Sequence, residues 1–158
     1  MRIRLFLAAL LLSSLVGFEV PQPVVIPDGA WGVLQVPAME ISMPLYTGPD
    51  QLIIDAENSA LVRRWGDGIL IADHAGSKHH GAEWRVNDMQ VGGACFVISH
   101  DETRAYRCTA ILLGENTGTA YEYRGRTVTP DKYDVICISC GRGKETFIAY
   151  LDFDGIIP

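Results

Sequence analysis

The chain consists largely of short, apolar, β-prone runs that end at glycine, proline or polar residues. The runs lie at residues 32–36, 43–46, 60–63, 68–72, 94–99, 105–113, 134–140 and 145–153. Most of them have the length of a strand rather than of a helix. With 158 residues, of which 48% are hydrophobic, the chain can form one domain with a substantial core. The pattern therefore predicts an all-β barrel or sandwich rather than a helical bundle.

The connections between these runs are expected to hold little regular structure. Residues 51–59 are the best candidate for a short helix, with Asp50 able to cap it. Residues 77–88 are polar and favour a loop or another short helix. Residues 115–132 form a long polar stretch, and loops of this length in compact domains are often functional.

The run that starts at Asp134 ends on a cysteine and then breaks at a glycine-bracketed turn, Gly141-Arg142-Gly143. Because side chains alternate along a strand, Cys140 is predicted to share a face with Ile136 and Ile138, and Cys137 to lie on the other face. A thiol at the rigid end of a strand, beside open glycine backbone and Arg142, can be reached by a substrate. Cys140 is therefore a candidate nucleophile, and the alternative is a buried structural thiol.

A nucleophilic thiol needs a base, and His74 is the best candidate. It follows the apolar run 68–72 directly after Asp73, so a second strand end would carry it. His79, His80 and His100 fall in expected loops or at a hairpin tip, where their placement would be looser. The alternative for His74 is a turn histidine that bonds to nearby backbone.

The sequence argues against two other classes of function. The formal net charge of −6 is unfavourable for binding nucleic acid or an anionic membrane surface. Cys137 and Cys140 have the C-x-x-C spacing of redox pairs and zinc sites, but residues three apart on a strand point to opposite faces. A hairpin centred on Asp101 and Glu102 would place Cys95 opposite Cys108, where a disulfide is an open possibility.

The N-terminus predicts export. Residues 1–18 hold two arginines followed by a short apolar run, the pattern of a signal peptide or of a short membrane anchor. Residues 19–30 are rich in proline and predict an extended spacer. We therefore expect residues 31–158 to form an extracytoplasmic domain, secreted or anchored at the cell surface, and cleavage versus anchoring stays open.

Four segments, in this order and spacing, resemble the sortase family of cysteine transpeptidases. They are Leu34-Gln35-Val36-Pro37, Pro44-Leu45-Tyr46-Thr47-Gly48, Ile71-Ala72-Asp73-His74 and Ile138-Ser139-Cys140. The resemblance runs from about Trp31 to Phe153. It implies a sortase-like eight-stranded β-barrel with one or two short helices. The activity that it implies requires no cofactor and no metal.

The resemblance also implies an activity and its partners. Cys140 would attack a peptide sorting signal in a protein substrate and form a thioester, His74 would exchange protons, and an amine acceptor or water would release the product. The loop over residues 115–132 would form part of the substrate wall. The family's third residue is an arginine on the strand after the cysteine; residues 145–153 contain none, and Arg142 is the nearest substitute. The alternative is an exported, non-catalytic sortase-fold barrel that serves as a binding or structural module.

Overall fold

In the computed structural model, which describes residues 19–49, 52–53, 59–73, 86–140 and 143–158, ten strands form one sheet. Two 3₁₀ helices, η1 and η2, lie between strands. The bounds are β1 Gly32–Val36, η1 Pro37–Met39, β2 Ile41–Tyr46, β3 Ala60–Trp65, β4 Gly68–Asp73, η2 Val86–Asp88, β5 Ala94–Ser99, β6 Thr103–Asn116, β7 Tyr121–Tyr123, β8 Arg126–Thr127, β9 Val135–Cys140 and β10 Glu145–Ile157.

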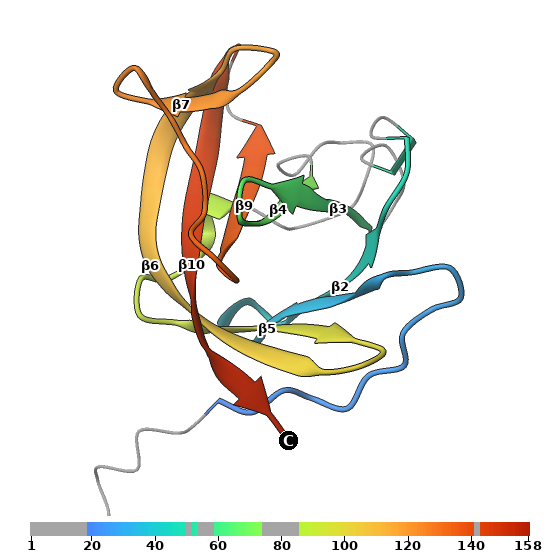
Figure 1. Ribbon diagram of the computed structural model, residues 1–158. Coiled ribbons are helices and arrows are strands. Elements are labelled where there is room, and N and C mark those ends of the chain that lie inside the picture. The colour runs from blue at the N-terminus through green and yellow to red at the C-terminus, as the bar shows by residue number, and fades with distance from the viewer. Residues whose placement is uncertain (1–18, 50–51, 54–58, 74–85, 141–142) are drawn as a thin grey trace, which may run out of the picture.

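Eight of these strands close into a barrel. Their order is β10-β9-β4-β3-β2-β1-β5-β6, and β6 pairs again with β10, so the sheet has no free edge between them. Figure 1 shows β6 and β10 running side by side over most of the height of the molecule, with β7 at one end. Strands β7 and β8 extend the sheet from the end of β6. The predicted all-β class and eight-stranded barrel are confirmed.

Alternation along the strands sorts the buried side chains into two clusters. The inner cluster draws on all eight barrel strands and fills the barrel, and it includes Val135 and Cys137 of β9. The outer cluster lies on the opposite face of β3, β4, β9 and β10, and it includes Ile136 and Ile138. The predicted division of β9 into two faces is therefore confirmed, and Cys137 is a core residue.

The hairpin of β5 and β6 differs from the prediction by a shift in register. Cys95 pairs with Tyr106 rather than with Cys108, and both cysteines are free thiols. The reason is the turn, which runs from Ser99 to Glu102 and is closed by a hydrogen bond from the Ser99 N–H to the Glu102 carbonyl. The expected direct opposition of the two cysteines was wrong because the hairpin turns one residue earlier.

The polar stretch over residues 115–132 contains more regular structure than expected. Strand β6 continues to Asn116, and β7 and β8 form a small hairpin around Arg124 and Gly125. Both turn residues have positive φ, 51° and 72°, as a tight type I′ turn requires. Of the predicted helix at 51–59, Leu52 and Ile53 are helical and most of the rest lies outside the described residues.

Residues 19–30 have no regular strand or helix but make contacts with the barrel. The side-chain amide of Gln35, which is buried, accepts from the Gln22 N–H at 2.9 Å and donates to the Gln22 carbonyl at 3.1 Å. The Glu19 carboxylate accepts from the Ala94 N–H at 3.3 Å. Residues 1–18 lie outside the described part of the chain. Among the described residues, no helix is long and apolar enough to cross a membrane.

Candidate functional site

Cys140 is the last residue of β9, and it differs from the other cysteines in exposure. Cys95, Cys108 and Cys137 are buried in the inner cluster, whereas Cys140 is exposed. Strand β9 is held on both sides, by β4 and by β10, so its end is fixed by backbone hydrogen bonding. A rigid strand end therefore presents one accessible thiol, as the sequence predicted.

The strand that leads to Cys140 lies beside the strand that leads to His74. Strands β4 and β9 are parallel, and their register ends where Asp73 pairs with Ser139. His74 follows Asp73 in the sequence, as Cys140 follows Ser139. Parallel pairing brings equivalent strand ends to the same edge of the sheet. His74 itself lies outside the described residues, as do Arg142 and the rival histidines 79 and 80.

The groups around the thiol disfavour its charged form. Although Cys140 is exposed as a residue, partial burial of the thiol raises its pKa, and the negative charge of Asp73 raises that pKa further. Asp73 is only 5% exposed. Ser139 is also buried, and its Oγ accepts a hydrogen bond from the Val86 N–H at 3.4 Å. The described surroundings therefore favour a neutral thiol before any reaction.

Thr146 occupies the position across from the thiol on the next strand. It is the register partner of Cys140 in the antiparallel β9–β10 pair, and it is buried. The sequence of β10 contains no arginine. The strand that follows the cysteine therefore places an uncharged hydroxyl opposite it.

The outer cluster extends from β9 to the β7–β8 hairpin. Tyr121 and Tyr123 of β7 and Val128, which follows β8, pack with Ile136 and Ile138 on the face that alternation assigns to Cys140. Trp65 is fixed over this region, since its Nε1–H donates to the Val128 carbonyl at 2.9 Å. Apolar packing thus connects the cysteine strand with the stretch predicted to contact a substrate.

His100 lies in the turn between β5 and β6, where one of its ring nitrogens is 3.4 Å from the Ala30 carbonyl oxygen. It is distant in sequence from Asp73 and from Cys140, which end β4 and β9.

A metal site is not formed in the part of the chain that the structure describes. No group of three or more histidine, cysteine or acidic side chains there has a metal-binding arrangement.

Asp73, and three residues that line a cavity at one end of the barrel, Trp31, Arg104 and Tyr106, were not identified from the sequence. Asp73 adjoins a candidate histidine, so its position could have indicated a role. Arg104 and Tyr106 share one face of β6, but Trp31 precedes β1, and no local pattern connects it with them.

Comparison with known proteins finds likeness in structure and not in sequence. No family model matches the chain, and no curated protein matches it. Sortase C1 from Streptococcus suis superposes with a TM-score of 0.66 at 14% identity, covering 81% of this chain and 74% of that one. Sortase E1 from Streptomyces coelicolor, with a tripeptide in its active site, gives 0.65 at 15% identity, covering 85% and 94%.

A third solved structure agrees with these two. Sortase A from Corynebacterium diphtheriae superposes with a TM-score of 0.62 at 13% identity, covering 82% of this chain and 62% of that one. At such identities the likeness concerns the arrangement of the backbone. Together with the closed eight-stranded barrel, it shows that this chain has a sortase-like fold.

Proposed function

We propose that this protein is a sortase-like cysteine transpeptidase. The observation that carries the proposal is the parallel pairing of β4 and β9, whose register ends at Asp73 and Ser139. The residues that follow these two in the sequence are His74 and Cys140, the pair that the sequence nominates as base and nucleophile. The exposure of Cys140, in contrast to the other three thiols, is a second support.

The reaction proceeds in two halves. The Cys140 sulfur attacks a backbone carbonyl carbon of the substrate, and His74 takes the thiol proton. When the tetrahedral intermediate collapses, the C–N bond breaks and His74 gives the proton to the leaving amine, which leaves a thioester on Cys140. An incoming amine, or water, loses a proton to His74, attacks the thioester and releases the product with the free thiol.

The raised pKa of Cys140 supports one order of events. Two charge states are open before attack, a thiol with a neutral imidazole or a thiolate with an imidazolium. Burial and Asp73 raise the pKa of Cys140, which supports the first of these, with proton removal by His74 accompanying attack. Negative charge then develops on the carbonyl oxygen, and a cation near it lowers the barrier. Since β10 carries Thr146 where it adjoins Cys140, we assign this role to Arg142, from the turn between β9 and β10.

The substrate is proposed to be a protein or peptide with a sorting signal that binds against the partly exposed edge of the outer cluster. Tyr121 and Tyr123 of β7 form this edge, over the buried Ile136 and Ile138, and apolar walls with few polar groups are typical of ligand sites. The amine acceptor would approach from the solvent side of Cys140. We place the domain outside the cytoplasm, with residues 1–18 as its signal peptide or anchor.

A thiol-labelling experiment tests the catalytic pair without a known substrate. At neutral pH, iodoacetamide should modify Cys140 much faster than the three buried thiols, as peptide mass analysis would show. His74→Ala should slow this labelling, and His100→Ala, at the β5–β6 turn, should leave it unchanged. Equal labelling rates in His74→Ala and the parent protein would remove the support for a cysteine–histidine pair.

A trapping experiment tests acyl transfer. The protein is incubated with a defined pool of peptides and with hydroxylamine as the amine acceptor. Peptide hydroxamates should form with the parent protein, and Cys140→Ala should abolish them. Transfer to hydroxylamine, compared with product formed in its absence, separates transpeptidation from hydrolysis.

The second candidate function is a non-catalytic binding or structural module on the same barrel. The specific observation in its favour is Thr146, an uncharged and buried residue at the position adjoining the cysteine on β10. The hypothesis of a non-catalytic module predicts that Cys140 is no more reactive than an ordinary exposed thiol. It also predicts that Cys140→Ala leaves binding of any partner protein intact.

A further inference from the structure

Two adjoining cavities open at the mouth of the barrel, away from Cys140. Their volumes are about 320 and about 350 Å³, and both are lined by Trp31, Ile69 and Arg104, so they lie on either side of these three residues. Ile69 pairs with Val135 at the beginning of the β4–β9 ladder, whereas Cys140 follows the last pair of that ladder, Asp73 and Ser139. We call the two together the mouth cavity, and each part has the size of a small-molecule site.

The mouth cavity also lies on a different face of the sheet from Cys140. Ile69 packs against the inner cluster, and the wall residue Val62 belongs to it, whereas Cys140 follows Ile136 and Ile138 of the outer cluster. A ligand in the mouth cavity would therefore occupy the barrel interior and would not cover the thiol. The site is independent of the transpeptidase proposal.

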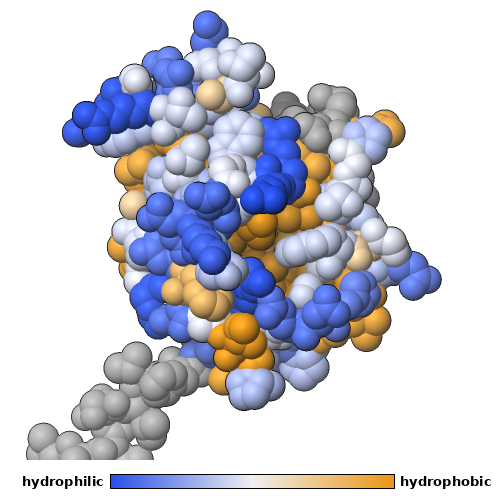
Figure 2. All heavy atoms as spheres, in the orientation of Figure 1, coloured by the Kyte–Doolittle hydropathy of each residue, from blue (hydrophilic) through white to orange (hydrophobic). Residues whose placement is uncertain are grey.

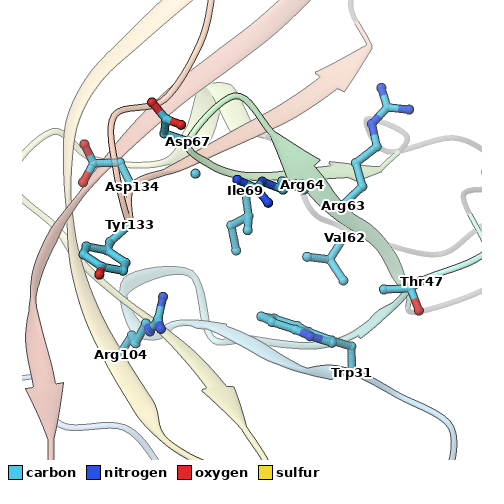
Figure 3. A pocket seen from close by; sticks show the side chains of 11 residues that line it. Trp31, Thr47, Val62, Arg63, Arg64, Asp67, Ile69, Arg104, Tyr133 and Asp134 are labelled. Atoms are coloured by element: carbon cyan, nitrogen blue, oxygen red, sulfur yellow. The ribbon is translucent and has the colours of Figure 1, made fainter.

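The walls of the mouth cavity are mostly apolar. Figure 3 shows Val62, Ile69, Trp31, Tyr133 and Arg104 arranged around a common space. Figure 2 shows a hollow on this face of the molecule, with hydrophobic atoms at its floor and hydrophilic ones around its rim. Trp31 is 39% exposed, an unusual position for so large an apolar ring, and it can be covered by a ligand that enters.

Arg104 supplies a fixed cation where the two parts of the cavity meet. Its guanidinium is paired with the Glu102 carboxylate and lies 5.5 Å from the centre of the Tyr133 ring. These two contacts hold the group in place, and the planar guanidinium has further N–H donors for a second partner. Arg104 is thus a preorganised donor and not a mobile surface charge.

The charged groups that face the first part of the cavity are balanced. Arg64 and Arg104 face it together with Asp67 and Asp134. The Arg63 side chain points away from the cavity in Figure 3, and its guanidinium lies 5.0 Å from the centre of the Trp65 ring. One oxygen of Asp134 is already engaged, since it accepts from the Phe153 N–H at 2.8 Å. The second part is lined at its rim by the acidic Asp101 and Glu102 and by His100. An anionic group that binds Arg104 would therefore meet less repulsion on the side of the first part than on the acidic side of the second.

Tyr106 provides an unused donor. It lines the second part, it is 1% exposed, and its hydroxyl makes no hydrogen bond of ordinary geometry within the described residues. Burial raises the pKa of Tyr106, and the Arg104 guanidinium, which lies close by, opposes that rise only in part. The hydroxyl is therefore protonated at neutral pH. The Arg104 guanidinium can only donate toward the phenol oxygen, so the O–H itself has no acceptor among the described residues, and a ligand oxygen could accept from it.

We propose that the mouth cavity binds a small organic carboxylate with an apolar body. The carboxylate accepts hydrogen bonds from the Arg104 guanidinium and the Tyr106 hydroxyl, and the apolar body packs between Trp31 and Ile69. The Phe153 ring, 5.9 Å from the Tyr106 ring in an edge-on contact, holds the phenol in this orientation.

Three small molecules that share the same phenylpropyl body and differ only in their polar end group test which end group the cavity prefers. They are 3-phenylpropionate, 3-phenylpropanol and 3-phenylpropylamine, titrated into the full chain and followed by calorimetry and by the Trp31 indole N–H signal in NMR. The carboxylate should bind at least about tenfold more tightly than the alcohol, the range expected when charged hydrogen bonds are lost. Cys140→Ala should bind it unchanged.

Two variants and a control locate the site. Tyr106→Phe removes only the hydroxyl and should weaken 3-phenylpropionate about three- to tenfold without weakening the alcohol as much. Arg104→Gln should weaken it about tenfold or more, with folding checked by thermal unfolding. Arg124→Gln, in the β7–β8 turn, should bind as the parent does.

Several results would overturn the proposal. These are equal binding of the alcohol, tighter binding of the amine, an unshifted Trp31 signal, or unchanged binding by Tyr106→Phe. Absence of any carboxylate binding at millimolar concentration would do the same. None of these outcomes depends on whether Cys140 is catalytic, so they leave the transpeptidase proposal to its own tests.

Discussion

Cys140 and Thr146 face one another across the β9–β10 pair, one exposed and the other almost completely buried. They are register partners, and Thr146 is 3% exposed. From Phe147 to Leu151, β10 holds only partly or fully buried residues. The position that adjoins the thiol therefore has room for a small side chain, and a cation that serves the thiol has to come from elsewhere.

Thr146→Arg is expected to destabilise the protein without increasing acyl transfer. An arginine at a site this deeply buried places a charge among apolar side chains, which costs about 3 kcal/mol when no partner is present. The free energy of unfolding, measured with urea, should fall by this order. Thr146→Val, of nearly the same shape, should change it by about 1 kcal/mol at most. A stable Thr146→Arg protein with faster hydroxamate formation would show that residue 146, and not Arg142, is the cation position.

Asp73→Asn is expected to make Cys140 react faster with iodoacetamide at pH values below the pKa of its thiol. The negative charge of Asp73 raises the pKa of the Cys140 thiol, so its removal lowers that pKa and increases the thiolate fraction at pH 8. The measurement is the iodoacetamide rate at Cys140 against pH. The two proteins should converge at high pH, where both thiols are ionised. Asp154→Asn, which removes an exposed partner of Arg107, serves as control and should follow the parent curve.

The barrel core is expected to lose stability at alkaline pH. Burial, with smaller contributions from Cys108 and Glu19, raises the pKa of Cys95 from 9.0 to about 12. Between these values the unfolded chain releases the thiol proton and the folded protein keeps it. The free energy of unfolding therefore falls as pH rises through this window. Under reducing conditions, Cys95→Ala should show a smaller fall between pH 8 and 10.5, whereas an identical slope would contradict the assignment.

Gln35 is expected to fix residues 19–30 on the barrel. Its buried amide makes both side-chain hydrogen bonds to the backbone of Gln22. Gln35→Leu removes both and should cost about 1–3 kcal/mol of unfolding free energy, with faster proteolytic cleavage within residues 19–30. Glu19→Gln changes only an exposed contact and should alter stability by less than about 0.5 kcal/mol. Unchanged proteolysis in Gln35→Leu would mean that other contacts hold this segment.

Local pattern was sufficient for the position of most strands and for their faces. Residues 32–36 and 94–99 were predicted with the bounds that β1 and β5 have, because alternation and flanking breakers mark both ends. The β7–β8 hairpin was missed although a signal was present. Alternating tyrosines precede Arg124-Gly125, a dipeptide that suits the positive φ values of a tight turn.

The register of the β5–β6 hairpin was harder to predict from the sequence. Cys95 and Cys108 fit a turn centred on residues 101 and 102, but the side chain of Ser99 also bonds within the turn, accepting from the Glu102 N–H at 3.2 Å. A one-residue shift of the turn changes every cross-strand pair, and a period of two cannot distinguish registers that differ by two residues. The packing of the whole barrel selects among them.

The sequence by itself determined the strand ends that carry Asp73 and Cys140, the separation of Cys137 from Cys140, and the all-β class, because these follow from side-chain alternation within short segments. Only the tertiary structure decided that β4 lies parallel to β9, that β6 closes on β10, and that Trp31, Arg104 and Tyr106 surround one cavity. Those relations join strands tens of positions apart in the chain, and they bring Trp31 to Arg104 and Tyr106 of β6. They depend on which faces bury each other, and no local pattern records that.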